Sequence, residues 1–359
     1  MNTALRFQPD YAVAPGAVLE ERLLAMGMSK SELARRCGRP QKTISEIVHG
    51  KAAITPETAL QLERVVGVRA SVWLNLEMQY RLKLAEQEEG ASLASLTKWA
   101  KKFPLAQLTA EGWLEPSNDD VSLVSKLLAF FGVGTIEGWR ESFQQPVAAY
   151  RRSPSFVAAP EAVAAWLRCG ELRAQEIDCA PFDAHEFRQV LREIRARLTR
   201  PTDAIWDEVV ELCARAGVAL VLIPEFPKTH LSGAARWLSP NKALIQQSVR
   251  HKSGDHLWFS FFHEAGHLLL HNKKVLFVDE QGGDQPEVEE EANRFARDWL
   301  LAPKPYAEFV AEADFTERAV RRFAKQQKIA PGIVVGRLQR ERHVSFAWLN
   351  GLKEKLTLQ

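Results

Sequence analysis

The sequence has 359 residues, of which 46% are hydrophobic and 26% are charged, and its formal net charge is +2. This composition excludes an intrinsically disordered chain, and the length exceeds that of one ordinary domain. A near-neutral total charge also excludes a protein that coats nucleic acid along its whole length, so any DNA binding must come from a local basic patch.

The cysteine pattern and the length of the apolar segments indicate the cellular compartment. The four cysteines are scattered without CxxC spacing, which is typical of reduced thiols in a cytoplasmic protein. Residues 1–10 lack a signal-peptide pattern, and no uninterrupted apolar run approaches the roughly 20 residues that span a bilayer. We therefore expect a cytoplasmic protein with no membrane partner.

Five helical segments are expected in a first domain of residues 1–90, the last of them running into Gly90. Ser29 opens a capping box that predicts a helix start, and Gly38 predicts the end of that helix. Pro40 is favoured at the first position of the next helix. The sequence here therefore fits helix, tight turn, helix.

The second helix of this pair has an apolar stripe and an opposite polar face. The apolar stripe, at helical spacing, consists of Ile44, Ile47 and Val48. The side chains left on the opposite face and at the exposed start are Gln41, Lys42, Ser45 and Glu46. An amide suits adenine, a lysine suits guanine and a carboxylate suits the cytosine amino group, so we predict that this face reads bases.

Basic side chains crowd the same segment, with six against two acidic ones, an excess of four positive charges. The basic residues are Lys30, Arg35, Arg36, Arg39, Lys42 and Lys51. We expect the phosphate contacts of a DNA duplex in this patch, with Lys30, Arg39 and Lys51 among them. A helical bundle with a solvated basic face would show the same capping and charge, so these features alone leave both interpretations open.

Several stretches resemble the Xre-type helix-turn-helix and are most similar to its HigA-like antitoxin branch. The stretches are Pro15-Gly16, Met28–Gly38, Thr43–Gly50, Ile54–Leu62 and Val72–Leu76, within about residues 14–85. The resemblance implies base reading by the four polar residues named above and a phosphate contact by Thr43. It also implies a homodimer on an inverted-repeat operator, repression of its own operon and a separately encoded toxin as partner.

Residues 91–200 are expected to form a largely helical middle region, to which the sequence assigns no chemistry. Its tryptophans are expected to be core or interface aromatics rather than ligand contacts, because large aromatic side chains mainly serve packing. They are Trp99, Trp113, Trp139 and Trp166.

Residues 201–359 are expected to form a third domain that mixes helices with a small β-sheet. Ala204–Ala216 has a helical pattern, and Val218–Ile223 is an apolar run typical of a buried strand. Gly233–Ser248 predicts further strand, with a turn at Ser239–Lys242. The whole chain is therefore expected to be mainly α, with a five-helix bundle first and an α+β domain last.

His263-Glu-Ala-Gly-His267 is an HExxH motif within this last domain. On a helix, residues four apart share a face, so both imidazoles can bind one zinc ion, and Glu264 lies where a carboxylate takes a proton from water. The motif also occurs by chance, but the apolar segments Trp258–Phe262 and Leu268–Leu270 on either side favour a buried helix. We therefore predict a zinc site with Glu264 as catalytic base.

A catalytic zinc needs a third protein ligand and one open position. An acidic cluster that begins at Glu287 offers this third ligand. We predict Glu289, which shares a helical face with Asn293, and Glu290 is the alternative. Ala292 is small enough for two helices to approach closely. A solvated acidic helix start, favoured by the helix dipole, explains Glu287 and Glu290 but not the pattern as a whole.

Two further features concern the surroundings of this site. His271 is not at the spacing of a third histidine ligand, so we expect it to pack beside the site or orient a ligand. The strand near Leu231–Gln246 is expected to hold an extended substrate by strand addition.

The last domain resembles the ImmA/IrrE metallopeptidase family over about residues 200–352. The matching stretches include Ser232–Trp237, Ala243–Ile245, Trp258-Phe259, His263–His267, Leu269–His271, Glu289–Ala296, Leu300–Pro303 and Ile329–Gln339. The resemblance implies a zincin-like fold in which His263, His267 and Glu289 bind zinc and Glu264 is the base. It also implies cleavage of repressor-type proteins, or action together with them, in stress and mobile-element control.

Two functions remain open at this point. The first is a DNA-binding transcription regulator whose zinc-dependent endopeptidase domain cleaves a repressor, an antitoxin or its own chain. The second is a non-proteolytic HigA-like antitoxin or autorepressor whose zinc domain is sensory or structural. The complete HExxH and glutamate set favours the first, because a structural zinc has no use for Glu264.

Overall fold

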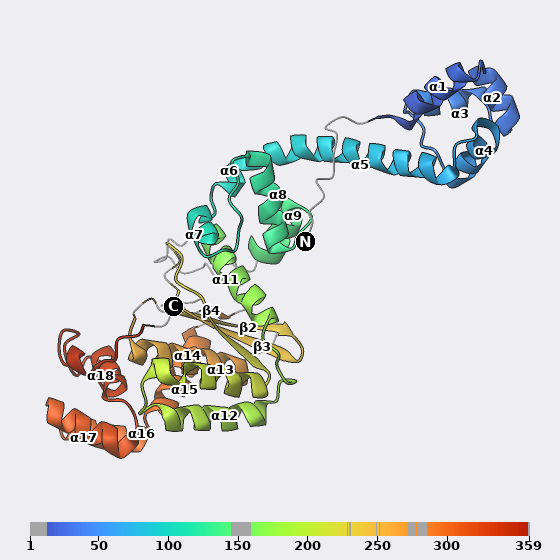
Figure 1. The fold of residues 1–359 in the computed structure, drawn as a ribbon. Helices are drawn as coiled ribbons and strands as arrows, with labels where there is room; N and C mark the ends of the chain where they lie inside the picture. The colour runs from blue at the N-terminus through green and yellow to red at the C-terminus, as the bar shows by residue number, and fades with distance from the viewer. Residues whose placement is uncertain are drawn as a thin grey trace. The chain divides into compact units, whose positions relative to one another are not determined.

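The computed structural model describes residues 13–144, 159–227, 229, 231–248, 250, 252–271, 277–278 and 286–357. The chain divides into two compact units, residues 1–97 and residues 98–359 (Figure 1). Helices dominate both units, and the described strands form one small sheet in the second. The predicted fold class, mainly α with a small C-terminal sheet, is confirmed.

Five helices build the first unit: α1 (Pro15–Ala25), α2 (Lys30–Cys37), α3 (Gln41–Val48), α4 (Pro56–Val66) and α5 (Ala70–Ala94). The Ser29 hydroxyl accepts a hydrogen bond from the Glu32 amide, and Gly38 ends α2 with a φ of 64°. Pro40 is the N-cap of α3 rather than its first residue. The predicted end of the last helix was wrong, since α5 continues through Gly90, where a glycine costs only about 1 kcal/mol.

A close approach between α1 and the end of α3 holds the first unit together at Gly16. A Cβ added there would overlap the carbonyl oxygens of Ile47 and Val48. We therefore expect Gly16→Ala to destabilise this unit by about 1–3 kcal/mol, because backbone must shift to make room. Chemical unfolding of the full chain, followed by a probe in this unit, measures the change.

Gly90→Ala is the matched control for this prediction. Gly90 lies within α5, and nothing lies within 4 Å of a Cβ added there. Alanine should stabilise the helix at this position by about 0.5–1 kcal/mol. Equal unfolding free energies for the two variants would contradict the close approach of α1 to α3.

The helices that follow α5 make the described part of residues 91–200 largely helical, and the last of them is the helix expected at Ala204–Ala216. They are α6 (Thr97–Ala100), α7 (Leu105–Ala110), α8 (Asp120–Phe131), α9 (Ile136–Trp139), a π-helix at Arg140–Gln144, α11 (Pro160–Gln175), α12 (Ala184–Arg197) and α13 (Thr202–Arg215). Trp139 and Trp166 are buried core residues, as predicted, and Trp99 packs edge-on against Trp139. Trp113 is half-buried beneath the guanidinium of Arg173, 5.2 Å from its ring centroid.

The sheet has the strand order β1-β3-β2-β4. Its strands are β1 (Val218–Leu222), β2 (Gly233–Ser239), β3 (Lys242–Gln247) and β4 (Phe277–Val278). β1 pairs with β3 in parallel, whereas β2 is antiparallel to both β3 and β4. The two predicted strand regions and the turn between β2 and β3 are confirmed, while β4 was not predicted.

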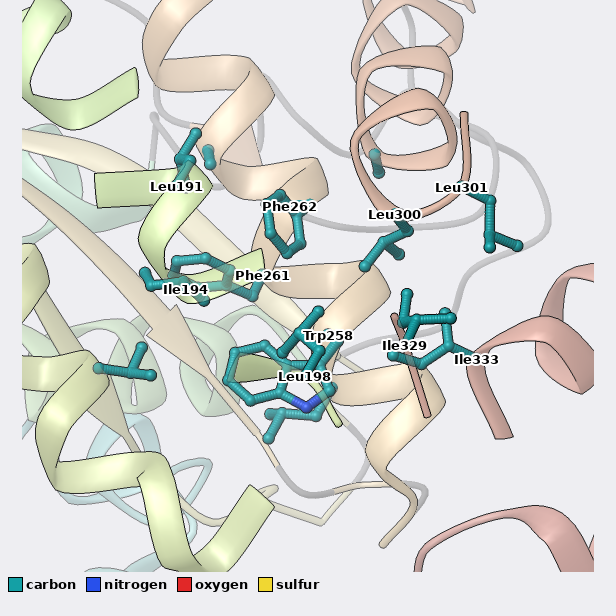
Figure 2. Close-up of a cluster of buried hydrophobic side chains, with 14 of the residues drawn as sticks. Leu191, Ile194, Leu198, Trp258, Phe261, Phe262, Leu300, Leu301, Ile329 and Ile333 are labelled. Carbon is teal, nitrogen blue, oxygen red and sulfur yellow. The ribbon is translucent and has the colours of Figure 1, made fainter. Parts of the chain in front are cut away.

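The remaining helices are α14 (Gly254–Leu270), α15 (Pro286–Leu300), α16 (Pro303–Ala311), α17 (Glu317–Gln327) and α18 (Pro331–Arg340), followed by a 3₁₀ turn at Asn350–Leu352. α14 is the central helix, which contacts β2 and β3 as well as α15 and α18. Its aromatic side chains enter the main core with residues of α12 and of the C-terminal helices (Figure 2). The core residues labelled in Figure 2 include Leu191, Ile194, Trp258, Phe261, Phe262 and Ile333. This packing fixes the helix that carries the HExxH motif.

Among the described residues, no single helix is both long and apolar enough to cross a membrane. The bent pair Asp120–Phe131 and Ile136–Gln144 meets these criteria only when its two helices are taken together.

Candidate nucleic-acid interface and candidate metal centre

α3 presents the predicted polar face of the helix-turn-helix. Its apolar stripe is buried, with Ile44 at 0% and Ile47 at 2% exposure. The polar side chains are exposed at Gln41 and Lys42 and half-buried at Thr43, Ser45 and Glu46. His49, which was not among the predicted contact residues, is exposed at the end of α3 and lies beside Ser45, with its Nδ1 2.6 Å from the Ser45 carbonyl oxygen.

Intramolecular pairs occupy much of the basic patch around α2 and α3. Lys30 pairs with Glu20 at 2.5 Å, and Lys42 lies 3.8 Å from Glu46. The side chain of Arg39 donates a hydrogen bond of 2.8 Å to Gln61. Such surface pairs contribute only about 0–1 kcal/mol, so exchanging them for phosphate contacts costs little.

Lys51 completes this patch. It is exposed, and its backbone amide donates to the carbonyl oxygen of Glu46, which fixes it close to the end of α3. The structure therefore brings all of the predicted contact residues onto or beside the helix-turn-helix pair.

The two histidines of the HExxH motif lie one turn apart on α14 and are almost completely buried. His263 and His267 are each 1% exposed, and their Nε2 atoms are 3.0 Å apart. Burial, together with the charges of His263 and His271, lowers the pKa of His267 to about 2. His267 is therefore a neutral imidazole at pH 7, which is the form that binds a metal ion.

Glu289 approaches this pair from α15. Its carboxylate oxygens lie 3.4 Å from His263 Nε2 and 3.5 Å from His267 Nε2. Zinc bonds of about 2.0–2.2 Å at tetrahedral angles separate ligand atoms by about 3.3–3.6 Å. The two carboxylate-to-imidazole distances and the two-nitrogen, one-carboxylate donor set therefore fit a zinc ion.

A close contact between α14 and α15 brings Glu289 into reach. A Cβ added at Gly266 would lie 3.3 Å from the Cα of Ala292, which is fully buried. The small side chain at Ala292 thus allows the two helices to approach, as its size predicted. Glu290, the alternative ligand, is exposed and pairs with Arg297 instead.

His271 extends the buried pair toward the surface. Its Nδ1 lies 3.0 Å from Nδ1 of His267, and its Nε2 lies 3.3 Å from a carboxylate oxygen of Glu291. This contact holds the ring nitrogen of His267 that faces away from Glu289, which is the geometry of a residue that orients a metal ligand.

Glu264 is fully buried and lies against the start of β2. A Cβ added at Gly233 would be 2.8 Å from Glu264 Oε1, so the glycine at this point of the strand lets the carboxylate approach. No local sequence pattern indicates this role of Gly233, because the contact joins a strand and a helix that are distant in the sequence.

The helix-turn-helix family profile matches residues 19–73 of this chain. Virulence-associated protein I of Dichelobacter nodosus is 43% identical over 79 residues, which cover 22% of this chain and 73% of that protein. The uncharacterized HTH-type transcriptional regulator YddM of Escherichia coli (strain K12) is 38% identical over 73 residues, which cover 20% of this chain and 78% of the relative.

A similar solved structure is an addiction module antidote protein of a HigA family from Coxiella burnetii. It is 32% identical and covers 23% of this chain and 92% of its own, with a TM-score of 0.22. Each of these matches spans less than a quarter of the chain. Two curated relatives that are more than 30% identical over more than two thirds of their own length show that the chain belongs to the helix-turn-helix family, with residues 19–73 as the family domain.

Proposed function

We propose that this chain is a transcription regulator that binds operator DNA and carries a zinc-dependent endopeptidase in its second unit. The main support for the peptidase function is the convergence of His263, His267 and Glu289 beside Glu264. The resemblance of the same residues to the ImmA/IrrE family supports it. The proposed substrate is a repressor-type or antitoxin-type protein in stress or mobile-element control.

The regulator half is supported by the exposed face of α3 and by the similarity to an HTH-type transcriptional regulator. Gln41 and Lys42 are exposed on the surface of the helical bundle, where they can reach base edges in a major groove. A homodimer would place two such helices on the half-sites of an inverted repeat. The proposed partner is therefore double-stranded operator DNA.

The peptidase half depends on the positions of buried groups on α14. A bound zinc ion would supply a Lewis acid and lower the pKa of a water molecule at its open position. Glu264 is placed to accept the proton of the attacking water and to pass it to the leaving amine. Burial of Glu264 and of both imidazoles keeps bulk water from competing for these protons.

Zinc binding tests the proposed ligand set. We expect about one zinc per chain in the wild type and loss of stoichiometric zinc in Glu289→Ala, because a catalytic site holds its ion by three protein ligands. Elemental analysis after dialysis against a weak chelator measures the zinc content.

Glu290→Ala is the matched control, since it removes a neighbouring carboxylate that pairs with Arg297 on the exposed side of α15. This variant should retain its zinc. Full zinc occupancy in Glu289→Ala together with loss in Glu290→Ala would assign the third ligand to Glu290.

The burial of His263, His267 and Glu264 favours a second candidate function, a non-proteolytic HigA-like antitoxin or autorepressor. Both histidines and Glu264 are at most 1% exposed, as in a closed structural zinc site, whereas a catalytic site needs an accessible open position. The Glu289 side chain is 20% exposed, so the three converging groups are less enclosed on the α15 side. A cognate toxin that binds the chain, with no cleavage of any partner, would favour the second candidate.

A further inference from the structure

An arginine of α12 holds the C-terminal end of α15, the helix that carries the proposed third zinc ligand. The Nε of Arg195 donates to the carbonyl oxygens of Trp299 and Leu300, at 3.1 and 3.0 Å. Its Nη1 and Nη2 donate to the carbonyl oxygens of Lys328 and Gln327, at 2.8 and 2.9 Å, where α17 ends. One side chain therefore joins the ends of two helices.

The chemistry of helix ends explains why an arginine occupies this position. The last carbonyl groups of a helix lack partners within the helix and carry partial negative charge, so a cation with several donors suits them. Burial lowers the pKa of the Arg195 guanidinium, and no carboxylate among the described residues forms an ion pair with it. The hydrogen bonds of this buried charge therefore go to the backbone of two helix ends.

A second arginine holds the same end of α15 from α18. The Nη1 of Arg337 donates to the carbonyl oxygens of Arg297 and Leu301, both at 3.1 Å. Its Nε donates to Glu341 at 3.0 Å, and its guanidinium lies 3.8 Å from the ring centroid of Tyr306. The two arginines, called the arginine clamp below, bind four carbonyl groups that point to different sides of the helix end. Together they restrict both the tilt and the rotation of α15.

The contact with α14 fixes another point of α15. A Cβ added at Gly266 would lie 3.3 Å from the Cα of Ala292. Ala292 follows Glu289 by one helical turn, about 4.5 Å along the axis, and the carbonyl groups of the clamp lie about 8–14 Å further on. A helix that is held at two such points has one direction and one rotation, and these set the position of the Glu289 carboxylate.

A zinc site is sensitive to this position. The Glu289 carboxylate lies 3.4 and 3.5 Å from the two imidazole nitrogens, and a metal–ligand bond tolerates a change of only about 0.2 Å. Successive residues of a helix are separated by about 100° around its axis, so rotation of α15 moves Glu289 away from α14. Loss of the clamp should therefore weaken metal binding without touching a ligand.

We propose that Arg195 and Arg337, the arginine clamp, are positioning residues that hold Glu289 at the zinc site from the far end of α15. The inference rests on the proposed zinc-dependent peptidase. It makes the metal affinity depend on two side chains whose described contacts are with backbone carbonyl groups, Glu341 and Tyr306, and not with the three converging ligands.

The zinc dissociation constant of the full chain, measured by competition with a chelating indicator, tests this role. Arg195→Ala should weaken zinc binding by about tenfold, because residues that orient metal ligands typically change the affinity by about 10–100-fold. Arg192→Ala is the matched control, since Arg192 is an exposed arginine of the same helix that bonds to Gln189. This control should bind zinc as tightly as the wild type.

A double-mutant cycle separates positioning from a general loosening of the fold. If Arg195 acts through Glu289, Arg195→Ala should change the residual zinc affinity of Glu289→Ala by less than about twofold. Equal weakening in both backgrounds would overturn the inference, because Arg195 would then support the histidines or the whole unit. Unchanged zinc affinity of the single variant Arg195→Ala would overturn it as well.

Arg337→Gln keeps the inference testable if Arg195→Ala fails to fold, which circular dichroism of the full chain reveals. This substitution removes the guanidinium that binds the carbonyl oxygens of Arg297 and Leu301. It should weaken zinc binding by about threefold or more in the wild-type background and by less than about twofold in Glu289→Ala. The same effect in both backgrounds would contradict the clamp.

The zinc content of the wild type separates this inference from the proposed function. A wild type that binds no zinc would refute the peptidase and the clamp together. One zinc per chain, without coupling between the clamp and Glu289, would refute the clamp and leave the peptidase. Coupling to Glu289 without cleavage of any candidate repressor or antitoxin would leave the clamp and refute the peptidase.

Discussion

Glu264→Gln should lower the rate of partner cleavage by about 10²–10⁴-fold and leave zinc content and operator binding unchanged. The glutamine side chain has nearly the same shape as glutamate but cannot accept a proton from the attacking water. Because Glu264 is fully buried against Gly233 and is not one of the three converging ligands, the substitution should not disturb the metal site. The rate is measured on candidate repressor and antitoxin proteins, with zinc content determined on the same samples.

Glu290→Gln provides the control, because it makes the same chemical change on the exposed side of α15. It should match the wild type in cleavage rate. If Glu264→Gln cleaves as fast as the wild type, Glu264 is not the base. If it loses its zinc, Glu264 acts as a ligand or a support of the site instead.

Replacement of Gln41, Lys42 and Glu46 with alanine should abolish preference for the chain's own promoter. Each good base contact contributes about 1–3 kcal/mol of discrimination, so the triple variant should lose about 100-fold or more in specificity. Lys42 is 85% exposed on its side-chain surface and only weakly paired, so its removal should not unfold the unit. Fluorescence anisotropy with promoter and scrambled duplexes, at one fixed salt concentration, measures the ratio.

Arg64→Ala is the control for the DNA experiment, since Arg64 is an exposed cation of α4, outside α2 and α3. It should keep the preference for the promoter. Retained promoter preference in the triple variant would contradict the assignment of α3 as the reading helix. Loss of preference in Arg64→Ala as well would indicate that the assay reports overall charge rather than base contacts.

Local signals account for the elements that could be predicted. The cap at Ser29, the stop at Gly38 and the apolar stripe of α3 each depend on residues within one or two turns, so sequence spacing suffices. The turn between β2 and β3 was predictable for the same reason. β4 was not, because its two residues pair with β2 across a long stretch of chain, and pairing at that distance leaves no local pattern.

In the candidate metal site too, some features follow from local sequence spacing, and others depend on contacts between distant segments. The shared face of His263 and His267 follows from helical periodicity alone. The choice between Glu289 and Glu290 depends on the rotation of α15 against α14, which the close contact at Gly266 and Ala292 sets. The approach of Gly233 to Glu264 joins β2 to α14, so it could not be predicted from spacing along the sequence.

Intact-mass spectrometry of candidate repressor and antitoxin proteins, after incubation with the full chain, tests the central proposal most directly. The zinc-loaded wild type should convert one such partner into two fragments with a single new N-terminus. Removal of zinc with a chelator should stop this conversion, and zinc addition should restore it, because the site depends on its ion. Intact partners throughout, with one zinc bound per chain, would contradict the peptidase and leave the chain as a DNA-binding antitoxin or autorepressor.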